Sequence, residues 1–357
     1  MKTVLYPSHL ELGAKVIEFA GWEMPIQYKG IIPEHLAVRE KVGMFDVSHM
    51  GRICVTGKDA ESLLDYLSTN KIKGKHNHSA TYTVWPMAGG GCVDDVIIYR
   101  QDEFHFFVVV NAGNRQKDLK HLRDYAKDLD VHIEDLFDQE GIIALQGPNA
   151  TALLYPLFME SKSLKNMHFI TLSYHGEKIV LSKTGYTGSG GFEIYAPNAL
   201  IALLWDWLLN EGDPFGLQPI GLGARDTLRL EMGYALYGHE INETISANES
   251  VSAWTIKWDK EDFLGKAAMQ KLEASPDKRT EYGVILQEKG IAREGYDVYK
   301  NGQMIGKVTS GNYAPSLDAA IAIILVKGKW AIGDTVDVQI RQNQVVAKIV
   351  ALPFLKI

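Results

Sequence analysis

Apolar residues recur every three or four positions in several stretches of the chain, a spacing that predicts helices with one buried face. The stretches are 33–43, 58–68, 114–128, 149–158 and 221–232. Pro33 suits the first position of the first helix, and Gly43 is expected to close it in the left-handed conformation. In the third helix we expect Leu119, Leu122 and Tyr125 to face the core.

Runs of alternating or β-branched residues predict strands between these helices. Residues 95–99 and 104–110 flank a short polar turn and predict a hairpin. Two further strands are predicted at 178–182 and 192–196, on either side of a glycine-rich connection. Helices and strands therefore alternate over most of the chain, which indicates a mixed α and β architecture.

The last quarter of the chain changes character after a charged linker at 276–279. Short strands and turn signals follow, among them the dipeptide of Asn301 and Gly302, which favours a two-residue hairpin turn. Strands at 336–340 and 345–351 flank another turn. This pattern predicts a small all-β domain at the C-terminal end.

Three consecutive glycines, 89–91, precede a strand that carries Asp94 and Asp95 near its beginning. Glycines allow a sharp turn and a close backbone approach. Successive side chains of a strand point to opposite faces, so only one of the two aspartates can face a given site. The alternative is that both aspartates only shape the turn. Our hypothesis is that one of the two aspartates points into a site and the other into a turn or cap, and the alternation alone does not say which.

Composition narrows the class of protein. The chain has 357 residues, of which 46% are hydrophobic, and can bury the core of two or three domains. Its net charge of −7 is spread without long blocks, which argues against a nucleic-acid surface. The N-terminus lacks an apolar signal core and no apolar run is long enough to cross a bilayer, so we expect a cytoplasmic protein. Cys54 and Cys92 form no CxxC pair and are expected to be small core residues.

A few histidines and arginines outside the aspartate pair are candidates for catalytic, metal-binding or ion-pair roles. His49 could be a base or a ligand, although a hydrogen-bonded, half-buried histidine is the expected state. His76 and His78 could share a metal ion, yet no third ligand can be assigned and a solvated loop is favoured, so no metal is expected. Arg225 and Arg229 lie four residues apart in a predicted helix and most often such charges form a structural ion-pair network.

The motifs along the chain resemble those of the aminomethyltransferases of the glycine cleavage system, the T-proteins, over nearly the full length. They are FAGWEMP at 19–25, EHLAVRE at 34–40, FDVSHMG at 45–51, DDVIIY at 94–99, LQGP at 145–148, TGYTG at 184–188, GFE at 191–193, GLGARDTLRLE at 221–231 and TSG at 309–311. Several are long and contain few generic turn residues, so chance is a poor explanation for them.

The resemblance implies a three-domain cloverleaf around a central folate site. Two lobes would be mixed α and β with antiparallel sheets, and the C-terminal domain would be an all-β, barrel-like domain. The expected boundaries are 1–51 with 140–272 for a discontinuous folate-binding domain, 52–139 for an inserted domain carrying Asp95, and 280–357 for the C-terminal domain.

The resemblance also implies an activity in one-carbon metabolism and glycine catabolism. Such an enzyme takes the aminomethyl group from a lipoyl arm carried by the H-protein, releases ammonia and forms methylenetetrahydrofolate. Tetrahydrofolate would be the co-substrate and the lipoylated H-protein the partner, with neither nucleic acid nor membrane involved.

By the same similarity, Asp95 would be the catalytic residue, facing the reactive nitrogens of the folate. Seven other residues fall on folate-contacting positions: Met50, Tyr82, Tyr99, Asn111, Tyr186, Glu193 and Arg225. A carboxylate such as Glu193 can accept the neighbouring N–H groups of a pterin. A planar ring such as Tyr186 suits flat ligands, and Arg225 offers a fork of donors.

Two alternatives remain open within the resemblance. One is a folate-dependent demethylase on the same fold, and the other is a non-catalytic folate-binding protein of the kind used in iron–sulfur cluster maintenance. The latter lack the aspartate pair and carry a cysteine in the glycine-rich segment, whereas here both aspartates are present and residues 184–188 contain no cysteine. The chain departs from the usual family pattern at Ser189 with Gly190, at residues 246–253, at Ala292 and at Leu355.

Overall fold

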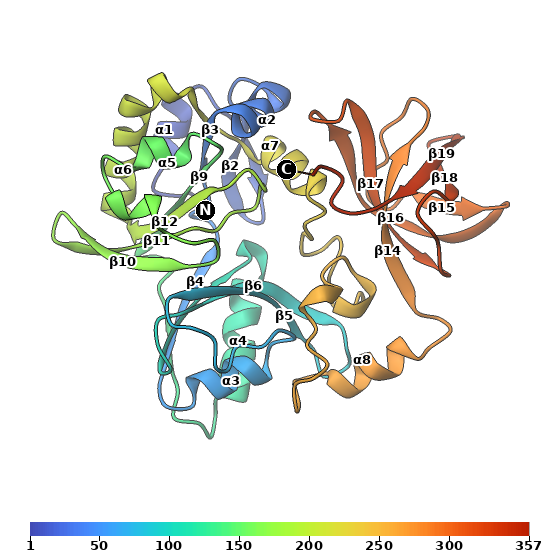
Figure 1. Ribbon diagram of the computed structural model, residues 1–357, viewed down its shortest axis with the longest axis horizontal. Coiled ribbons are helices and arrows are strands. Elements are labelled where there is room, and N and C mark those ends of the chain that lie inside the picture. The colour runs from blue at the N-terminus through green and yellow to red at the C-terminus, as the bar shows by residue number, and fades with distance from the viewer. Residues whose placement is uncertain (357) are drawn as a thin grey trace. The chain divides into compact units, whose positions relative to one another are not determined.

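The computed structural model, drawn with its helices and strands in Figure 1, describes residues 1–356. The chain divides into two compact units. The first unit comprises Met1–Leu64, Ile72–Tyr82 and Val96–Asp226, and the second comprises Asp65–Lys71, Thr83–Asp95 and Thr227–Ile357. No helix among residues 1–356 is both long and apolar enough to span a membrane.

The first unit is built on a six-stranded sheet. In spatial order its strands are β10 (Phe169–Tyr174), β11 (Glu177–Ser182), β12 (Gly191–Pro197), β9 (Glu140–Gln146), β3 (Val42–Asp46) and β13 (Leu217–Pro219). Neighbouring strands are antiparallel, except that β13 runs parallel to β3. The pairing of β11 with β12 confirms the two strands predicted around the glycine-rich connection.

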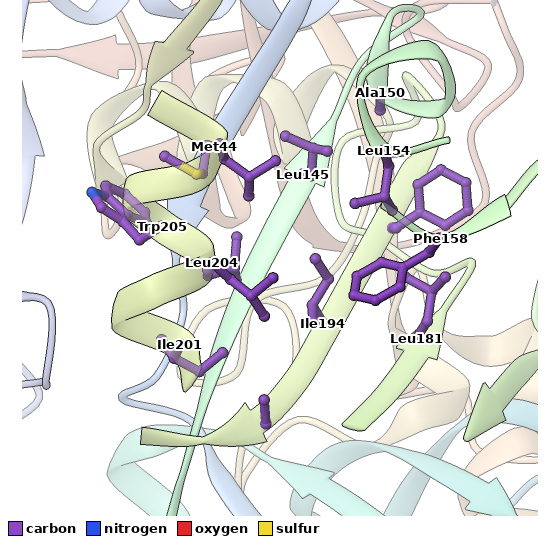
Figure 2. Close-up of a cluster of buried hydrophobic side chains, with 14 of the residues drawn as sticks. Met44, Leu145, Ala150, Leu154, Phe158, Leu181, Ile194, Ile201, Leu204 and Trp205 are labelled. Atoms are coloured by element: carbon purple, nitrogen blue, oxygen red, sulfur yellow. The ribbon is translucent and has the colours of Figure 1, made fainter. Parts of the chain in front are cut away.

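Helices α5 (Ala150–Leu154) and α6 (Asn198–Gly212) pack on this sheet, and apolar side chains from the helices and the sheet form a buried core between them (Figure 2). Leu145 and Ile194 of the sheet are fully buried together with Leu204 and Trp205 of α6. The apolar residues of α6 follow the spacing of a buried helical face, yet this helix is absent from the predicted set.

A hairpin and two helices complete the N-terminal part of the first unit. They are α1 (Tyr6–Glu11), β1 (Lys15–Phe19), β2 (Trp22–Gln27) and α2 (Ile31–Glu40). The strands β1 and β2 are antiparallel and joined by the turn at Ala20 and Gly21.

A second sheet has five strands, in the order β5 (Ser79–Pro86), β6 (Cys92–Arg100), β7 (His105–Val110), β4 (Gly51–Thr56) and β8 (His132–Asp135), with helices α3 (Ala60–Tyr66) and α4 (Arg115–Tyr125) in the same segment. Strands β6 and β7 are antiparallel, with Tyr99 opposite Phe107, which confirms the predicted hairpin. Strands β5 and β6 each contribute residues to both units.

The second unit contains a closed six-stranded barrel. Its strands, in order, are β14 (Arg279–Leu286), β17 (Ala319–Lys327), β16 (Gln303–Ala314), β15 (Asp297–Lys300), β18 (Thr335–Ile340) and β19 (Asn343–Val350). Asn301 and Gly302 both have positive φ in the turn between β15 and β16, as the dipeptide predicts. The mixed α and β fold class with antiparallel sheets and a C-terminal barrel is therefore confirmed.

The rest of the second unit includes α7 (Leu222–Glu231), whose last turns belong to it, and α8 (Lys266–Glu273). Short 3-10 helices lie in the first unit at Ala112–Asn114, Met159–Lys162 and Asp213–Phe215, and in the second unit at Ala247–Glu249 and Ala253–Thr255. Gly91 packs against the chain at Glu243, because a Cβ at Gly91 would lie 2.0 Å from the Glu243 carbonyl oxygen. Gly91 thus serves a close approach of two backbones, and Gly90 has a positive φ in the turn, whereas a Cβ at Gly89 would meet no atom within 4 Å.

Some local predictions were wrong. Helix α2 ends at Glu40, and Gly43 lies within β3, where a Cβ would lie 2.4 Å from Val38. Gly43 therefore serves tight packing and not a left-handed cap. In α4, Tyr125 is 38% exposed and not inward-facing, and Cys54 is only half-buried although Cys92 is buried.

Candidate functional site

Glu193 lies on β12, directly after the glycine-rich connection, and is 8% exposed. Its register places it opposite Ser182 on β11 and Ala144 on β9. Its Oε2 atom contacts three hydroxyl groups: Thr184 at 2.5 Å, Tyr195 at 2.9 Å and Tyr99 at 3.3 Å. Its Oε1 atom has no hydrogen-bond partner within the described part of the chain. One oxygen of the carboxylate is thus held by the protein, and the other can still accept hydrogen bonds.

The two tyrosines beside Glu193 are neutral donors. Burial, reinforced by the Glu193 carboxylate, raises the pKa of Tyr99 and of Tyr195 above the ordinary value for tyrosine. Both phenols therefore keep their protons at any pH at which the protein works. Tyr99 is fully buried, so its contact with Glu193 lies in the interior of the first unit.

Tyr186 and Arg225 come together in the same unit. The guanidinium carbon of Arg225 lies 4.6 Å from the centre of the Tyr186 ring, a cation–π contact that orients both side chains. Both residues are partly exposed. The flat ring of Tyr186 and the N–H donors of the Arg225 guanidinium therefore lie side by side and partly exposed.

The glycine-rich connection is held by Gln146, a fully buried residue at the end of β9. Its Nε2 atom donates to the Thr184 carbonyl oxygen at 3.1 Å, and its Oε1 atom accepts from the Thr187 hydroxyl at 2.9 Å. A Cβ at Gly185 would lie 1.9 Å from Gln146 Oε1, so glycine is required there. Gln146 thereby fixes the segment that leads to Glu193.

The turn after β3 carries His49 and Met50, and a buried carboxylate supports it. Asp46 accepts hydrogen bonds from Thr3 Oγ1 at 2.6 Å, from His9 Nε2 at 2.9 Å and from the Ser48 amide at 2.9 Å. Burial raises the pKa of Asp46, but the interaction with His9 and the hydrogen bonds from Thr3 and Ser48 together outweigh it and lower the pKa overall. Asp46 is therefore an ionised anchor of this turn.

His49 differs from the expected half-buried, hydrogen-bonded state. It is only 4% exposed, and its Nδ1 atom has no partner among residues 1–356. Burial lowers its pKa to about 4, with help from Arg225 and Arg52 and against the attraction of Asp46. His49 is therefore neutral at physiological pH. The expectation of a half-buried, hydrogen-bonded His49 was wrong, because the near alternation of apolar and polar residues around it does not show how deeply the rest of the protein covers this turn.

Acidification is expected to destabilise the protein through His49. In the unfolded chain this imidazole titrates near 6.5 and in the folded protein near 4, so the unfolded state binds more protons between these values. The contribution of His49 to the free energy of unfolding is fully present above pH 6.5 and falls by roughly 3 kcal/mol as the pH drops to 4. Urea unfolding of the wild type and of His49→Gln across this range measures it. The variant should lose less stability on acidification, and equal losses in both proteins would contradict the assignment.

The aspartate pair follows the expected alternation, but Asp94, and not the predicted site residue Asp95, is its buried member. Asp94 is fully buried within β6 and lies in no turn or cap, whereas Asp95 is partly exposed. Alternation fixes that the two side chains point to opposite faces, but not which face is covered. Asp95 belongs to the second unit, and the other seven predicted site residues belong to the first.

Three comparisons with known proteins bear on this arrangement. Residues 5–260 match the family model described as GCVT N-terminal domain, and residues 279–356 match the glycine cleavage T-protein C-terminal barrel domain. The chain belongs to the glycine cleavage T-protein family. It is therefore a transferase enzyme, and the family resemblance expected from its motifs is confirmed.

Individual members of the T-protein family are similar over the whole chain. The aminomethyltransferase of Chlorobium luteolum is 44% identical, with 99% of this chain and 98% of the relative covered, and that of Pseudothermotoga lettingae is 41% identical, with 99% and 97% covered. The crystal structure of the glycine cleavage system aminomethyltransferase T from Bartonella henselae superposes with a TM-score of 0.93 at 32% identity, covering 99% of this chain and 98% of that one.

Within this T-protein scaffold, Met50, Tyr82 and Asn111 are partly exposed. They keep side-chain surface available for contact, and their roles stay predictions. His76 and His78 are exposed, and residues 1–356 contain no group of three or more potential ligands that could hold a metal ion.

Arg52 and Gln146 are structural supports of the site that were not predicted from the sequence. Arg52 is fully buried and donates to the carbonyl oxygens of Met50 at 2.7 Å, Phe137 at 2.6 Å and Glu140. It thereby fixes the turn that carries Met50. Both residues lie in or beside T-protein motifs, at 45–51 and 145–148, and this proximity is the signal that could have indicated them.

Proposed function

We propose that this enzyme transfers a one-carbon unit from an aminomethyl group to tetrahydrofolate, within the glycine cleavage system. The aminomethyl group arrives on the lipoyl arm of the H-protein. The products are ammonia, 5,10-methylenetetrahydrofolate and the reduced lipoyl arm.

The observation that carries this proposal is the state of Glu193. Its Oε2 atom is engaged by hydroxyl groups, and its Oε1 atom is without a partner among the described residues. A pterin presents an amino group and a ring N–H side by side, and such donors form charge-assisted hydrogen bonds with a carboxylate. The residues present therefore fit a pterin as ligand.

Tyr186 and Arg225 support the same ligand. The ring of Tyr186 suits contact with a flat pterin or aminobenzoyl group, and Arg225, 4.6 Å from its centre, suits an oxo group or carboxylate. Met50, Tyr82 and Asn111 are proposed as further contacts along the folate.

Asp95 is the proposed catalytic residue. The reaction brings a weak aryl-amine nucleophile against a methylene carbon while ammonia departs, so positioning supplies much of the acceleration. A carboxylate hydrogen-bonded to the folate amine can orient it and stabilise positive charge that develops near the transferred carbon. Partial exposure of Asp95 leaves it accessible to a substrate.

Ammonia release from aminomethyl-loaded H-protein, measured with and without tetrahydrofolate, tests the proposal. We expect rapid release and formation of methylenetetrahydrofolate only when both substrates are present. Release that does not depend on folate would contradict it. Transfer to folate from a small methylated amine, without the H-protein, would favour the demethylase alternative, and folate binding without any transfer would favour the non-catalytic one.

A further inference from the structure

Four buried hydroxyl groups lie behind Glu193, and we refer to them as the hydroxyl cluster: Tyr99, Ser182, Thr184 and Tyr195. All four are buried, with exposed fractions of 0%, 0%, 6% and 2% respectively. Tyr99, Thr184 and Tyr195 contact Glu193. In addition, the Thr184 hydroxyl lies 2.9 Å from that of Ser182 and 3.2 Å from that of Tyr99, and the two tyrosine oxygens are 2.8 Å apart. The cluster is therefore a continuous hydrogen-bonded network that ends on one carboxylate oxygen.

The number of protons decides the direction of these hydrogen bonds. Each hydroxyl has one proton to donate, and a carboxylate oxygen offers two lone pairs. Thr184 and Tyr195 are the two closest donors to Glu193 Oε2, at 2.5 and 2.9 Å. Tyr99 then donates to the Tyr195 oxygen at 2.8 Å, in preference to the 3.3 Å contact with Glu193. Thr184 Oγ1 also lies 2.9 Å from Ser182 Oγ. The protons of Thr184, Tyr195 and Tyr99 are thus the ones directed toward Glu193.

Such a chain strengthens the hydrogen bonds at its end, because each donor polarises the next in a medium of low dielectric constant. Glu193 Oε2 is saturated by Thr184 and Tyr195. Glu193 Oε1 is then the oxygen that remains, and it can only accept. A ligand with an acceptor at this position would leave two acceptors facing each other, and a ligand without a donor would leave Oε1 unsatisfied.

We propose that the hydroxyl cluster determines ligand specificity, by holding Glu193 as an obligate acceptor that selects a heterocycle with an N–H donor edge. This inference rests on the proposed function in that the ligand is taken to be a folate. Thr184, Tyr195 and Tyr99 are positioning residues, since they act through Glu193. In their absence Glu193 Oε2 loses its protein donors, so the orientation of the carboxylate is no longer fixed and it discriminates less between ligands.

The test compares two ligands. One is tetrahydrofolate, and the other is an analogue in which the 2-amino group of the pterin is replaced by a methyl group. Dissociation constants are measured for the wild type and for the Thr184→Val and Tyr195→Phe variants. The wild type is expected to prefer tetrahydrofolate by at least tenfold, since a site built for a donor rejects ligands that lack it.

In Thr184→Val and Tyr195→Phe this preference is expected to fall at least several-fold, with KM for tetrahydrofolate raised and kcat at saturation little changed. Thr184→Ser keeps the hydroxyl and should restore the wild-type preference. Tyr174→Phe, on β10 of the same sheet, serves as the matched control and should keep it. A merely structural role would not alter the ratio of the two affinities in folded variants.

The outcomes distinguish a failure of the role proposed for the hydroxyl cluster from a failure of the proposed function. A wild type that prefers tetrahydrofolate, with variants that retain the full preference, would overturn the role of the cluster and leave the proposed function intact. A Thr184→Ser variant that behaves like Thr184→Val would also overturn it. A wild type that binds neither ligand would contradict the proposed function itself.

Discussion

Replacing Arg229 with methionine is expected to lower the free energy of unfolding by about 3–5 kcal/mol, the cost typical of breaking a buried ion pair from one side. Arg229 is 2% exposed and lies 3.0 Å from Glu240, which is fully buried. It also donates to the Tyr234 carbonyl oxygen at 3.1 Å and to Ser310 Oγ at 2.9 Å. Without Arg229, the Glu240 carboxylate would remain in the interior with no countercharge.

A neighbouring acid increases this sensitivity. Glu281 is buried, and burial together with Glu240 raises its pKa well above the ordinary value, against the attraction of Arg229. Arg229 therefore balances more than one carboxyl group. Loss of its charge leaves the Glu240 carboxylate with hydrogen bonds from the Leu236 amide and the Thr309 hydroxyl but without its ion-pair partner.

Urea unfolding of Arg229→Met measures this effect, with the double variant Arg229→Met/Glu240→Gln as the matched comparison. Removing both charges should recover much of the loss, because no uncompensated carboxylate remains. A single variant that loses less than about 1 kcal/mol, a value ordinary for exposed pairs, would show that the pair contributes little.

Replacing Asp95 with asparagine is expected to lower turnover at least about tenfold, equivalent to about 1.4 kcal/mol of transition-state stabilisation. Asparagine keeps the size of the side chain and can still form hydrogen bonds, but it removes the negative charge that would stabilise a developing positive charge at the transferred carbon. General acid or base assistance typically contributes about 10²- to 10⁴-fold, so tenfold is a lower bound.

The measurement is single-turnover ammonia release in a reconstituted system with loaded H-protein and tetrahydrofolate. The dissociation constant for folate and the stability of Asp95→Asn should stay close to those of the wild type. Asp102→Asn, in the exposed turn between β6 and β7, is the control for removal of a carboxylate from the same hairpin. Unchanged turnover in Asp95→Asn would remove this residue from the proposed role.

Much of the fold could be predicted because local sequence signals and the final structure agree. Asn301 and Gly302 need positive φ in their turn, and the strands on either side alternate, so the hairpin of β15 and β16 followed directly. Gly43 shows where local signals fail. Its role depends on Val38 and on Ile220, which is distant in sequence, and no local pattern at Gly43 indicates how close Ile220 lies.

The site was predictable to a smaller extent, and chiefly through family motifs. Glu193 and Arg225 were named from the resemblance, since a single acid or base has no distinguishing pattern of its own. Tyr195 was missed because a tyrosine in an apolar strand is ordinarily read as a core residue. The burial of Asp94 relative to Asp95 could not be predicted either, because alternation separates two faces without saying which one the rest of the protein covers.

The guanidinium of Arg52 has a consequence for the affinity of the proposed folate contact at Met50. By bridging the carbonyl oxygens of Met50, Phe137 and Glu140, it immobilises the Met50 turn already in the unliganded protein. A flexible turn would lose conformational entropy when a ligand ordered it, and that loss would weaken association. Because Arg52 orders this turn during folding, the proposed folate contact at Met50 would cost little conformational entropy, and more of the interaction energy would remain as affinity.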